Sequence, residues 1–256
     1  MRANCLHLVI IAIACTLVIS CKRETIEFTT DPLSEYVPLQ SGKYFIYRLD
    51  STVFTGSGRF TEVHSYQEKH EIDAPFTDLL GRPGYRIFRF LRDTAGTQPW
   101  VSAGTYYITP TETTVEVNEN NMRVVKLALP ISSGFRWKPN LHLPDEPFGS
   151  LYSFQNEFDM YDWDNTYGNI TGTEEINGKT YNNVIVVEGV NRASNVPVTD
   201  PGSYGYIDYQ VSKYAKGLGL IYEEWIMWDY QPPASGSSTV GFKTGFGMMR
   251  SLIDHN

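Results

Sequence analysis

The chain has 256 residues, with 29 acidic and 21 basic side chains and a formal net charge of −8 at pH 7. Because an acidic protein repels the phosphate backbone, we expect no nucleic-acid partner. Aromatic residues make up 14% of the chain, and together with 21 Gly and 14 Pro they favour a β-sandwich or barrel over a helical fold.

The first 20 residues have the parts of a secretory signal peptide. Arg2 is their only charged side chain, and an almost wholly apolar stretch runs over 6–19. Spanning a bilayer takes about 20 apolar residues, so a permanent transmembrane helix is the weaker interpretation. The stretch ends at 17–21 with LVISC, which resembles the lipobox of bacterial lipoproteins. The resemblance implies cleavage of 1–20 and a lipid on the thiol of Cys21.

The cysteine positions agree with this interpretation. The three cysteines are Cys5, Cys15 and Cys21, and the first two would leave with the signal peptide. The mature protein would then have no disulfide and no Cys-based metal or redox site. After Cys21 we expect a lipidated N-terminus and flexible tether over 21–35, followed by a single β-rich globular domain over 36–256.

The first half of that domain predicts six strands joined by short turns. The segment 85–90 alternates, which places Tyr85, Ile87 and Arg89 on one face of its strand. The other strands are expected at 44–49, 59–72, 100–109, 113–118 and 122–129, with a turn at 119–121.

The second half begins with an irregular, proline-containing stretch over 130–164, in which a short helix over 149–160 is weakly indicated. A hairpin follows, because 169–176 and 181–188 flank Asn177-Gly178, a dipeptide that favours a type I′ turn. The last strands are expected at 204–214, 219–230 and 238–253.

These elements predict an all-β fold with little helix. Parallel strands need crossovers of a dozen residues or more, and the connections here are mostly shorter, so the pairing should be antiparallel. We expect a curved antiparallel sheet of about 10–12 strands, forming an incomplete barrel or a sandwich.

Two pairs of titratable residues are candidates for chemistry, and both fail on strand geometry. Glu223 and Glu224 are adjacent, so they point to opposite faces of a strand and cannot flank one glycosidic bond. We interpret them as two charges on a half-exposed strand. His64 and His70 share a face but would lie about 20 Å apart on one strand, too far for a shared zinc ion. We assign no catalytic residue, no metal ligand and no cofactor.

The segment 157–167 combines carboxylates with aromatic rings. Its acidic run could hold Ca²⁺, but Tyr167 stands where an EF-hand loop starting at Asp162 needs Gly, so a solvated acidic loop is the main interpretation. A platform for a sugar or peptide is the alternative to core packing for the neighbouring rings. The carboxylates and amide concerned are Glu157, Asp159, Asp162, Asp164 and Asn165, and the rings are Tyr161, Trp163, Trp225, Trp228 and Tyr230.

Three segments are similar to uncharacterised outer-membrane lipoproteins of Bacteroidetes. They are YVPLQSGKYFIY at 36–47, NGKTYNNV at 177–184 and YAKGLGLIY at 214–222. The resemblance implies the outer membrane as location but no catalytic residue. In that phylum acidic residues soon after the lipidated Cys favour surface export, and Lys22-Arg23-Glu24 leaves the side of the membrane undecided. The phylum also O-glycosylates short Asp-Ser/Thr triplets, which points to Ser51 and Thr94.

From these observations we expect a lipid-anchored protein of the cell envelope. Its role should be non-enzymatic binding or assembly, with a concave sheet face as binding site and an envelope protein or a glycan as partner. The alternative is a glycan-directed hydrolase or a carbohydrate-binding lipoprotein that uses the 157–167 loop.

Overall fold

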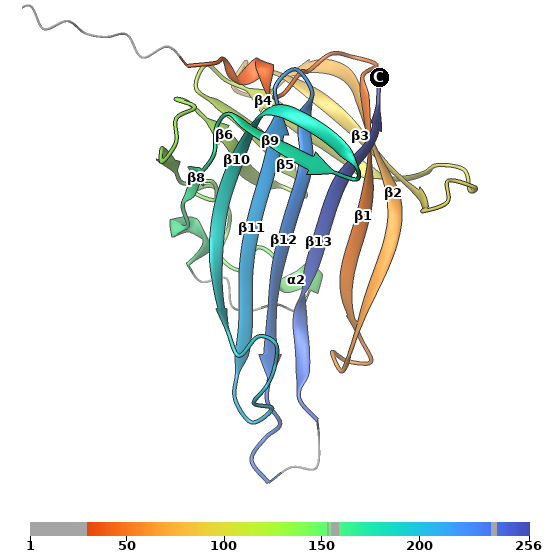
Figure 1. The fold of residues 1–256 in the computed structure, drawn as a ribbon, viewed down its shortest axis with the longest axis vertical. Coiled ribbons are helices and arrows are strands. Elements are labelled where there is room, and N and C mark those ends of the chain that lie inside the picture. The colour runs from red at the N-terminus through yellow and green to blue at the C-terminus, as the bar shows by residue number, and fades with distance from the viewer. Residues whose placement is uncertain (1–29, 153, 155–158, 237–239) are drawn as a thin grey trace, which may run out of the picture.

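A computed structural model describes residues 30–152, 154, 159–236 and 240–256. They form one antiparallel sheet of thirteen strands, which curls into a nearly closed barrel (Figure 1). The strands are β1 (Tyr44–Thr55), β2 (Phe60–Thr77), β3 (Pro83–Asp93), β4 (Val101–Pro110), β5 (Thr114–Glu119), β6 (Met122–Ala128), β7 (Arg136–Trp137), β8 (Asn165–Tyr167), β9 (Gly172–Ile176), β10 (Lys179–Ser194), β11 (Gly205–Ala215), β12 (Gly219–Gln231) and β13 (Phe242–His255).

The order of the strands and the contact between the two ends of the sheet define the barrel. The path runs β6-β5-β4-β3-β2-β1-β13-β12-β11-β10-β8-β7, with β9 paired to β10, so the first and last long strands of the chain are neighbours. The two ends of the path also meet. The Val125 N–H in β6 donates to the Pro139 carbonyl at 2.9 Å, and the Trp137 indole N–H in β7 donates to the Val125 carbonyl at 3.0 Å. The predicted all-β incomplete barrel is therefore confirmed.

Two of the tight turns follow directly from the sequence. Asn120 and Asn121 connect β5 to β6 with φ values of 52° and 61°, and Asn177 and Gly178 connect β9 to β10 with 53° and 73°. Positive φ at both central residues defines the type I′ turn, whose twist matches that of the flanking strands. Both predicted turns are confirmed.

Helix is scarce in the described residues, as expected. The 3₁₀ helices η1 (Leu33–Glu35) and η2 (Met160–Asp162) have three residues each, and α2 (Gly149–Tyr152) has four. Within the described residues, the helix predicted over 149–160 is present only as α2 and η2, and 153 and 155–158 lie outside the described residues. In the described part of the chain, no helix is long and apolar enough to cross a membrane.

The N-terminal segment packs across one end of the barrel. Leu33 is 6% exposed and Tyr36 2%, and both belong to the same buried cluster as strand residues such as Tyr167. The Gly217 N–H donates to the Glu35 carbonyl at 2.6 Å, which ties η1 to the β11–β12 turn. Residues 30–35 of the expected tether, which precede the boundary predicted at residue 36, therefore pack as part of the domain (Figure 1).

The rest of the core fills the barrel in two further clusters. One lies beside the N-terminal segment and includes Tyr47, Ile87 and Leu252. The other includes Phe148 from the irregular 130–164 stretch and Phe246 from β13. The barrel interior between them is polar, and it contains the candidate site.

Candidate functional site

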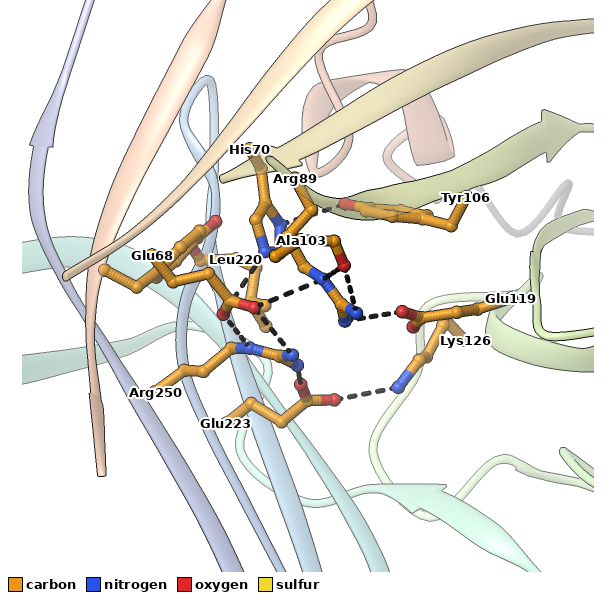
Figure 2. Close-up of polar contacts among 11 residues, drawn as sticks. Glu68, His70, Arg89, Ala103, Tyr106, Glu119, Lys126, Leu220, Glu223 and Arg250 are labelled. Atoms are coloured by element: carbon orange, nitrogen blue, oxygen red, sulfur yellow. Dashed lines mark hydrogen bonds and ion pairs between the residues drawn. The ribbon is translucent and has the colours of Figure 1, made fainter. Parts of the chain in front are cut away.

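Charged side chains from six strands meet inside the barrel (Figure 2). Each points into the barrel from the same strand face as apolar side chains two positions away. Arg89 shares its face with Ile87, and Glu223 shares its face with Ile221 and Trp225. We call these six side chains the ionic floor. They are Glu68 (β2), Arg89 (β3), Glu119 (β5), Lys126 (β6), Glu223 (β12) and Arg250 (β13).

Arg250 is the centre of the floor. Its Nε donates to Glu68 Oε2 at 2.6 Å, and its Nη1 donates to Glu223 Oε2 at 2.7 Å. The two carboxylates are 2% and 3% exposed, so a single guanidinium bridges two buried carboxylates. The adjacency of β12, β13, β1 and β2 brings these three residues together.

Lys126, Arg89 and Glu119 surround this core. Lys126 Nζ donates to Glu223 Oε1 at 2.8 Å. Arg89 Nη1 lies 2.5 Å from Glu119 Oε1, and Arg89 also donates through Nη2 to the Ala103 carbonyl at 3.0 Å. Its Nε lies 3.7 Å from Glu68 Oε1. The floor is therefore one continuous network across the barrel (Figure 2).

His70 borders the floor on the side of the N-terminal segment. Its Nδ1 lies 2.9 Å from the Tyr106 hydroxyl, and its Nε2 lies 3.3 Å from Glu68 Oε2. That Nε2 is buried and makes no hydrogen bond to any described residue. The imidazole is held between the Tyr47 and Tyr106 rings, at centroid distances of 5.2 and 5.4 Å.

Glu68, Glu223 and Arg250 stay charged at neutral pH. Burial alone would raise the pKa of Glu68, but Arg250 and His70 hold the pKa of that carboxyl far below its ordinary value. Burial acts in the same direction on Glu223, and Lys126 and Arg250 overcome it and lower its pKa to about 2. Burial would lower the pKa of Arg250, whereas Glu68 and Glu223 raise it well above its ordinary value.

This arrangement argues against acid–base hydrolysis at the floor. A glycosidase keeps one carboxyl protonated as general acid, and the environments of its two carboxyls push their pKa values apart. Here the pKa values of Glu68 and Glu223 are both lowered. Neither carboxyl can therefore deliver a proton near neutral pH, and what the floor offers is fixed charge and hydrogen bonding.

Two cavities lie on either side of the floor. The large cavity has a volume of about 790 Å³ and the small cavity about 140 Å³. Arg89, Glu119, Lys126, Glu223 and Arg250 line both, so the floor divides the barrel interior. Residues 36–39 of the N-terminal segment line the small cavity, which lies at the covered end.

The wall and the mouth of the large cavity are mainly apolar, with a few polar side chains such as Ser51 and Asn120 among them. Strand residues such as Leu91, Val124 and Trp225 line the wall. At the mouth, Leu151 and Phe242 also line the cavity and are 52% and 40% exposed. The mouth includes the β1–β2 turn and the start of β13, at the opposite end of the barrel from the N-terminal segment (Figure 1).

Glu223 and Glu224 point to opposite faces of β12, as predicted. Their interpretation as two charges on a half-exposed strand is wrong for Glu223. Glu223 points inward and belongs to the floor, whereas Glu224 points to the opposite face and accepts a hydrogen bond from the Tyr222 hydroxyl at 2.8 Å. Glu223 is thus no half-exposed charge, because its strand is buried on that side.

The two histidines lie in different environments. His64 is 45% exposed and pairs with Glu62 at 3.1 Å, whereas His70 is buried beside the floor. In the described residues, no group of three or more His, Cys, Asp or Glu side chains could hold a metal ion.

The carboxylates of the 157–167 segment form separate ion pairs instead of converging on one point. Asp159 binds Arg192 at 2.7 Å, and Lys138 lies 2.9 Å from Asp162 and 3.1 Å from Asp164. Asn165 is buried at the start of β8. Glu157 lies outside the described residues. The described part of this segment therefore gives no support to a hydrolase or calcium site.

The aromatic rings pack instead of forming a platform. Trp225 contacts Phe148 and Phe246 inside the barrel, at centroid distances of 5.3 and 5.5 Å. Trp228 faces outward, and Lys243 covers its ring at 4.2 Å. Core packing, the main interpretation, holds for Trp163, which belongs to one buried cluster, and for Trp225, which packs against that cluster. Trp228 and Tyr230 are buried outside the core clusters, and Tyr161 is 56% exposed.

The predicted modification sites have different settings. Ser51 is in β1 and lines the large cavity, which makes it a poor glycan acceptor. Thr94 is exposed in the turn between β3 and β4. Cys21, the predicted lipidation site, lies outside the described residues.

Comparison with known proteins assigns no family. No protein-family model matches the chain, and no curated protein matches it. A solved structure described as an exported protein with a YmcC-like fold, from Bacteroides fragilis, is 10% identical with a TM-score of 0.36, covering 84% of this chain and 97% of that one. An outer-membrane lipoprotein-sorting protein domain from Vibrio parahaemolyticus is 12% identical with a TM-score of 0.19, covering 84% and 85%. A DUF1329 family protein from Desulfovibrio piger is 11% identical, also with a TM-score of 0.19, covering 89% and 93%.

Proposed function

We propose that this protein is a lipid-anchored protein of the bacterial outer membrane that binds an amphiphilic small molecule inside its barrel. The observation that carries the proposal is the large cavity. Its volume of about 790 Å³ falls within the range of about 300–1,000 Å³ that is typical of small-molecule sites. An apolar wall around a few fixed polar groups is the usual composition of such a site.

The two ends of the barrel give the ligand a direction of entry. Residues 33–39 cover one end, and the mouth of the large cavity is at the other. The proposed anchor, Cys21, is nine residues before Thr30, a span of at most about 30 Å in an extended chain. The covered end would therefore face the membrane that holds the anchor, and the ligand would enter from the aqueous side.

Binding fits the floor better than catalysis does. A catalytic carboxyl or histidine needs a pKa matched to proton transfer near the working pH. Glu68 and Glu223 instead have lowered pKa values, and both are held in ion pairs. The floor can therefore offer a bound molecule fixed charge and hydrogen bonds without proton transfer from these two carboxyls.

Binding of an apolar dye tests the cavity. N-phenylnaphthylamine fluoresces when it enters an apolar site, and Val124→Trp would place an indole in the large cavity. We expect the wild-type protein to enhance the dye fluorescence and Val124→Trp to lose most of that signal. Val63→Trp is the matched control, since Val63 is 61% exposed and does not line the cavity. Equal dye binding by both variants, or none by the wild type, would contradict the proposal.

The anchor is tested separately by the intact mass of the protein purified from its native envelope. We expect a chain that starts at Cys21 and carries two or three acyl chains, which together hold a protein at a membrane. We expect Cys21→Ala to be released into the soluble fraction. A start at another residue, or a mass without acyl chains, would contradict the anchor and leave the cavity proposal standing.

A further inference from the structure

We propose that the ligand of the large cavity has a zwitterionic head group, whose cationic part lies at Glu119 and whose anionic part lies at Lys126. This inference rests on the proposed function and specifies its ligand class. It starts from the charge balance of the ionic floor. Three cations, Arg89, Lys126 and Arg250, face three carboxylates, so the floor has no net charge (Figure 2).

A balanced floor selects against a head group with net charge. Burying an uncompensated charge inside a protein is costly unless a partner neutralises it. Each floor carboxylate already has a cationic partner, and each cation has a carboxylate. An anionic or cationic head group would therefore enter the barrel without a counter-charge, whereas a zwitterion keeps the balance.

Only part of the floor can be reached by a ligand. Glu68 and Glu223 are 2% and 3% exposed, and Arg250 is 13% exposed. Glu119, in contrast, is 31% exposed and Lys126 is 21% exposed. Arg89 is also 24% exposed, but its guanidinium is paired with Glu119. The reachable part of the floor therefore consists of the Glu119–Arg89 ion pair and of Lys126, with Glu119 and Lys126 on the adjacent strands β5 and β6 (Figure 2).

Both of these groups have bonding capacity to spare. Lys126 binds one carboxylate, Glu223, among the described residues, and an ammonium has three N–H donors. Glu119 lies close to Arg89 through one oxygen, and a carboxylate has about four acceptor sites. Charge-assisted hydrogen bonds are about twice as strong as neutral ones, which favours a zwitterion over an uncharged polar head group.

The mouth fixes the orientation of the ligand. The floor is deep in the barrel, and the wall above it is mainly apolar up to Leu151 and Phe242 at the rim. With the head group on the floor, an acyl chain would run along the wall and emerge between these exposed apolar side chains. The opposite orientation would leave the floor without a polar partner and place the head group against an apolar rim.

Two lysophospholipids with the same acyl chain test the head group. Myristoyl lysophosphatidylethanolamine is zwitterionic, and myristoyl lysophosphatidylglycerol is anionic. Each is titrated below its critical micelle concentration against the full-length protein loaded with N-phenylnaphthylamine, and displacement of the dye gives its affinity. We expect the ethanolamine lipid to bind about tenfold more tightly, a difference of about 1.4 kcal/mol.

Two floor variants should change this preference in a defined direction. Glu119→Gln removes one carboxylate and gives the floor a net positive charge, so the glycerol lipid should become the tighter ligand. Lys126→Met leaves the floor negative and should weaken the glycerol lipid most, which provides a second readout if Glu119→Gln does not fold. Glu62→Gln is the matched control, because Glu62 is a 50% exposed carboxylate on β2 outside the cavity.

The outcomes separate this inference from the proposed function. Equal affinity for the two lipids, a tighter glycerol lipid in the wild type, or an unchanged preference in Glu119→Gln would overturn the zwitterion and leave the cavity as a binding site. Failure of the wild type to bind the dye and both lipids would overturn the proposed function and the inference with it.

Discussion

Replacing Arg250 by Leu should destabilise the protein more than any surface ion-pair change. The substitution leaves Glu68 and Glu223, which are 2% and 3% exposed, without their shared guanidinium. Removing one partner of a buried ion pair typically costs about 3–5 kcal/mol, because the other charge stays buried. The pKa of Glu223 agrees in direction, because Lys126 and Arg250 together overcome the effect of burial and lower it.

Urea denaturation of the purified protein, followed by tryptophan fluorescence, measures this loss. Arg48→Leu is the matched control: Arg48 is 51% exposed and pairs with Asp50 at 2.9 Å, and exposed pairs contribute about 0–1 kcal/mol. Adding Glu68→Gln and Glu223→Gln to Arg250→Leu should recover much of the lost stability, since no buried charge is then stranded. A loss in Arg250→Leu no larger than that in Arg48→Leu would refute the reasoning.

The pH dependence gives an independent check on the same substitution. In Arg250→Leu, burial raises the pKa of Glu68 above its value in the unfolded chain, so protonation at lower pH should relieve the penalty. The difference in unfolding free energy between wild type and variant should therefore shrink from pH 7 to pH 4. A constant difference over that range would show that the lost stability does not come from stranded carboxylates.

Three further predictions follow from the same structure. In the wild type, the pKa values of Glu68 and Glu223 are lowered on folding, so both carboxylates stabilise the fold above the unfolded pKa of about 4.3. The urea midpoint should therefore stay constant from pH 7 to 5 and fall towards pH 2. A midpoint that stays constant down to pH 2 would contradict this. Gly178→Ala, at φ 73°, should cost about 1 kcal/mol in urea unfolding, against little for Gly202→Ala at an exposed turn without positive φ. Tyr36→Ala should cost about 3–5 kcal/mol in the same assay if the N-terminal segment belongs to the core; a loss below about 1 kcal/mol would make it peripheral.

Much of the fold could be predicted because its determinants are local. The alternation of Tyr85, Ile87 and Arg89 marks the inward face of β3, and Asn177-Gly178 encodes its turn without help from the rest of the chain. The covered end could not be predicted. The segment around Leu33 is mostly polar in sequence. Leu33 and Tyr36 become buried because they pack into the open end of the barrel, which the sequence does not reveal.

The ionic floor was missed for a different reason. Glu68 and Arg250 are 182 positions apart in the sequence, and only the pairing order β2-β1-β13 makes them neighbours. A signal was nevertheless present. Charged residues in line with an apolar strand face, as Arg89 is with Ile87 and Glu223 with Trp225, indicate charge inside a barrel. The sequence alone shows no partner for either charge, so it predicts a half-exposed charge for Glu223 and no role for Arg89.

The central claim is that the large cavity holds an amphiphile, and native mass spectrometry of the protein purified from its own envelope fraction tests it most directly. We expect the wild type to carry one non-covalent adduct with the mass of a single zwitterionic amphiphile, removable by organic solvent. Val124→Trp, which fills the cavity, should lack the adduct, and Val63→Trp should keep it. A wild type that is free of adduct and takes up no added lysophospholipid would contradict the claim.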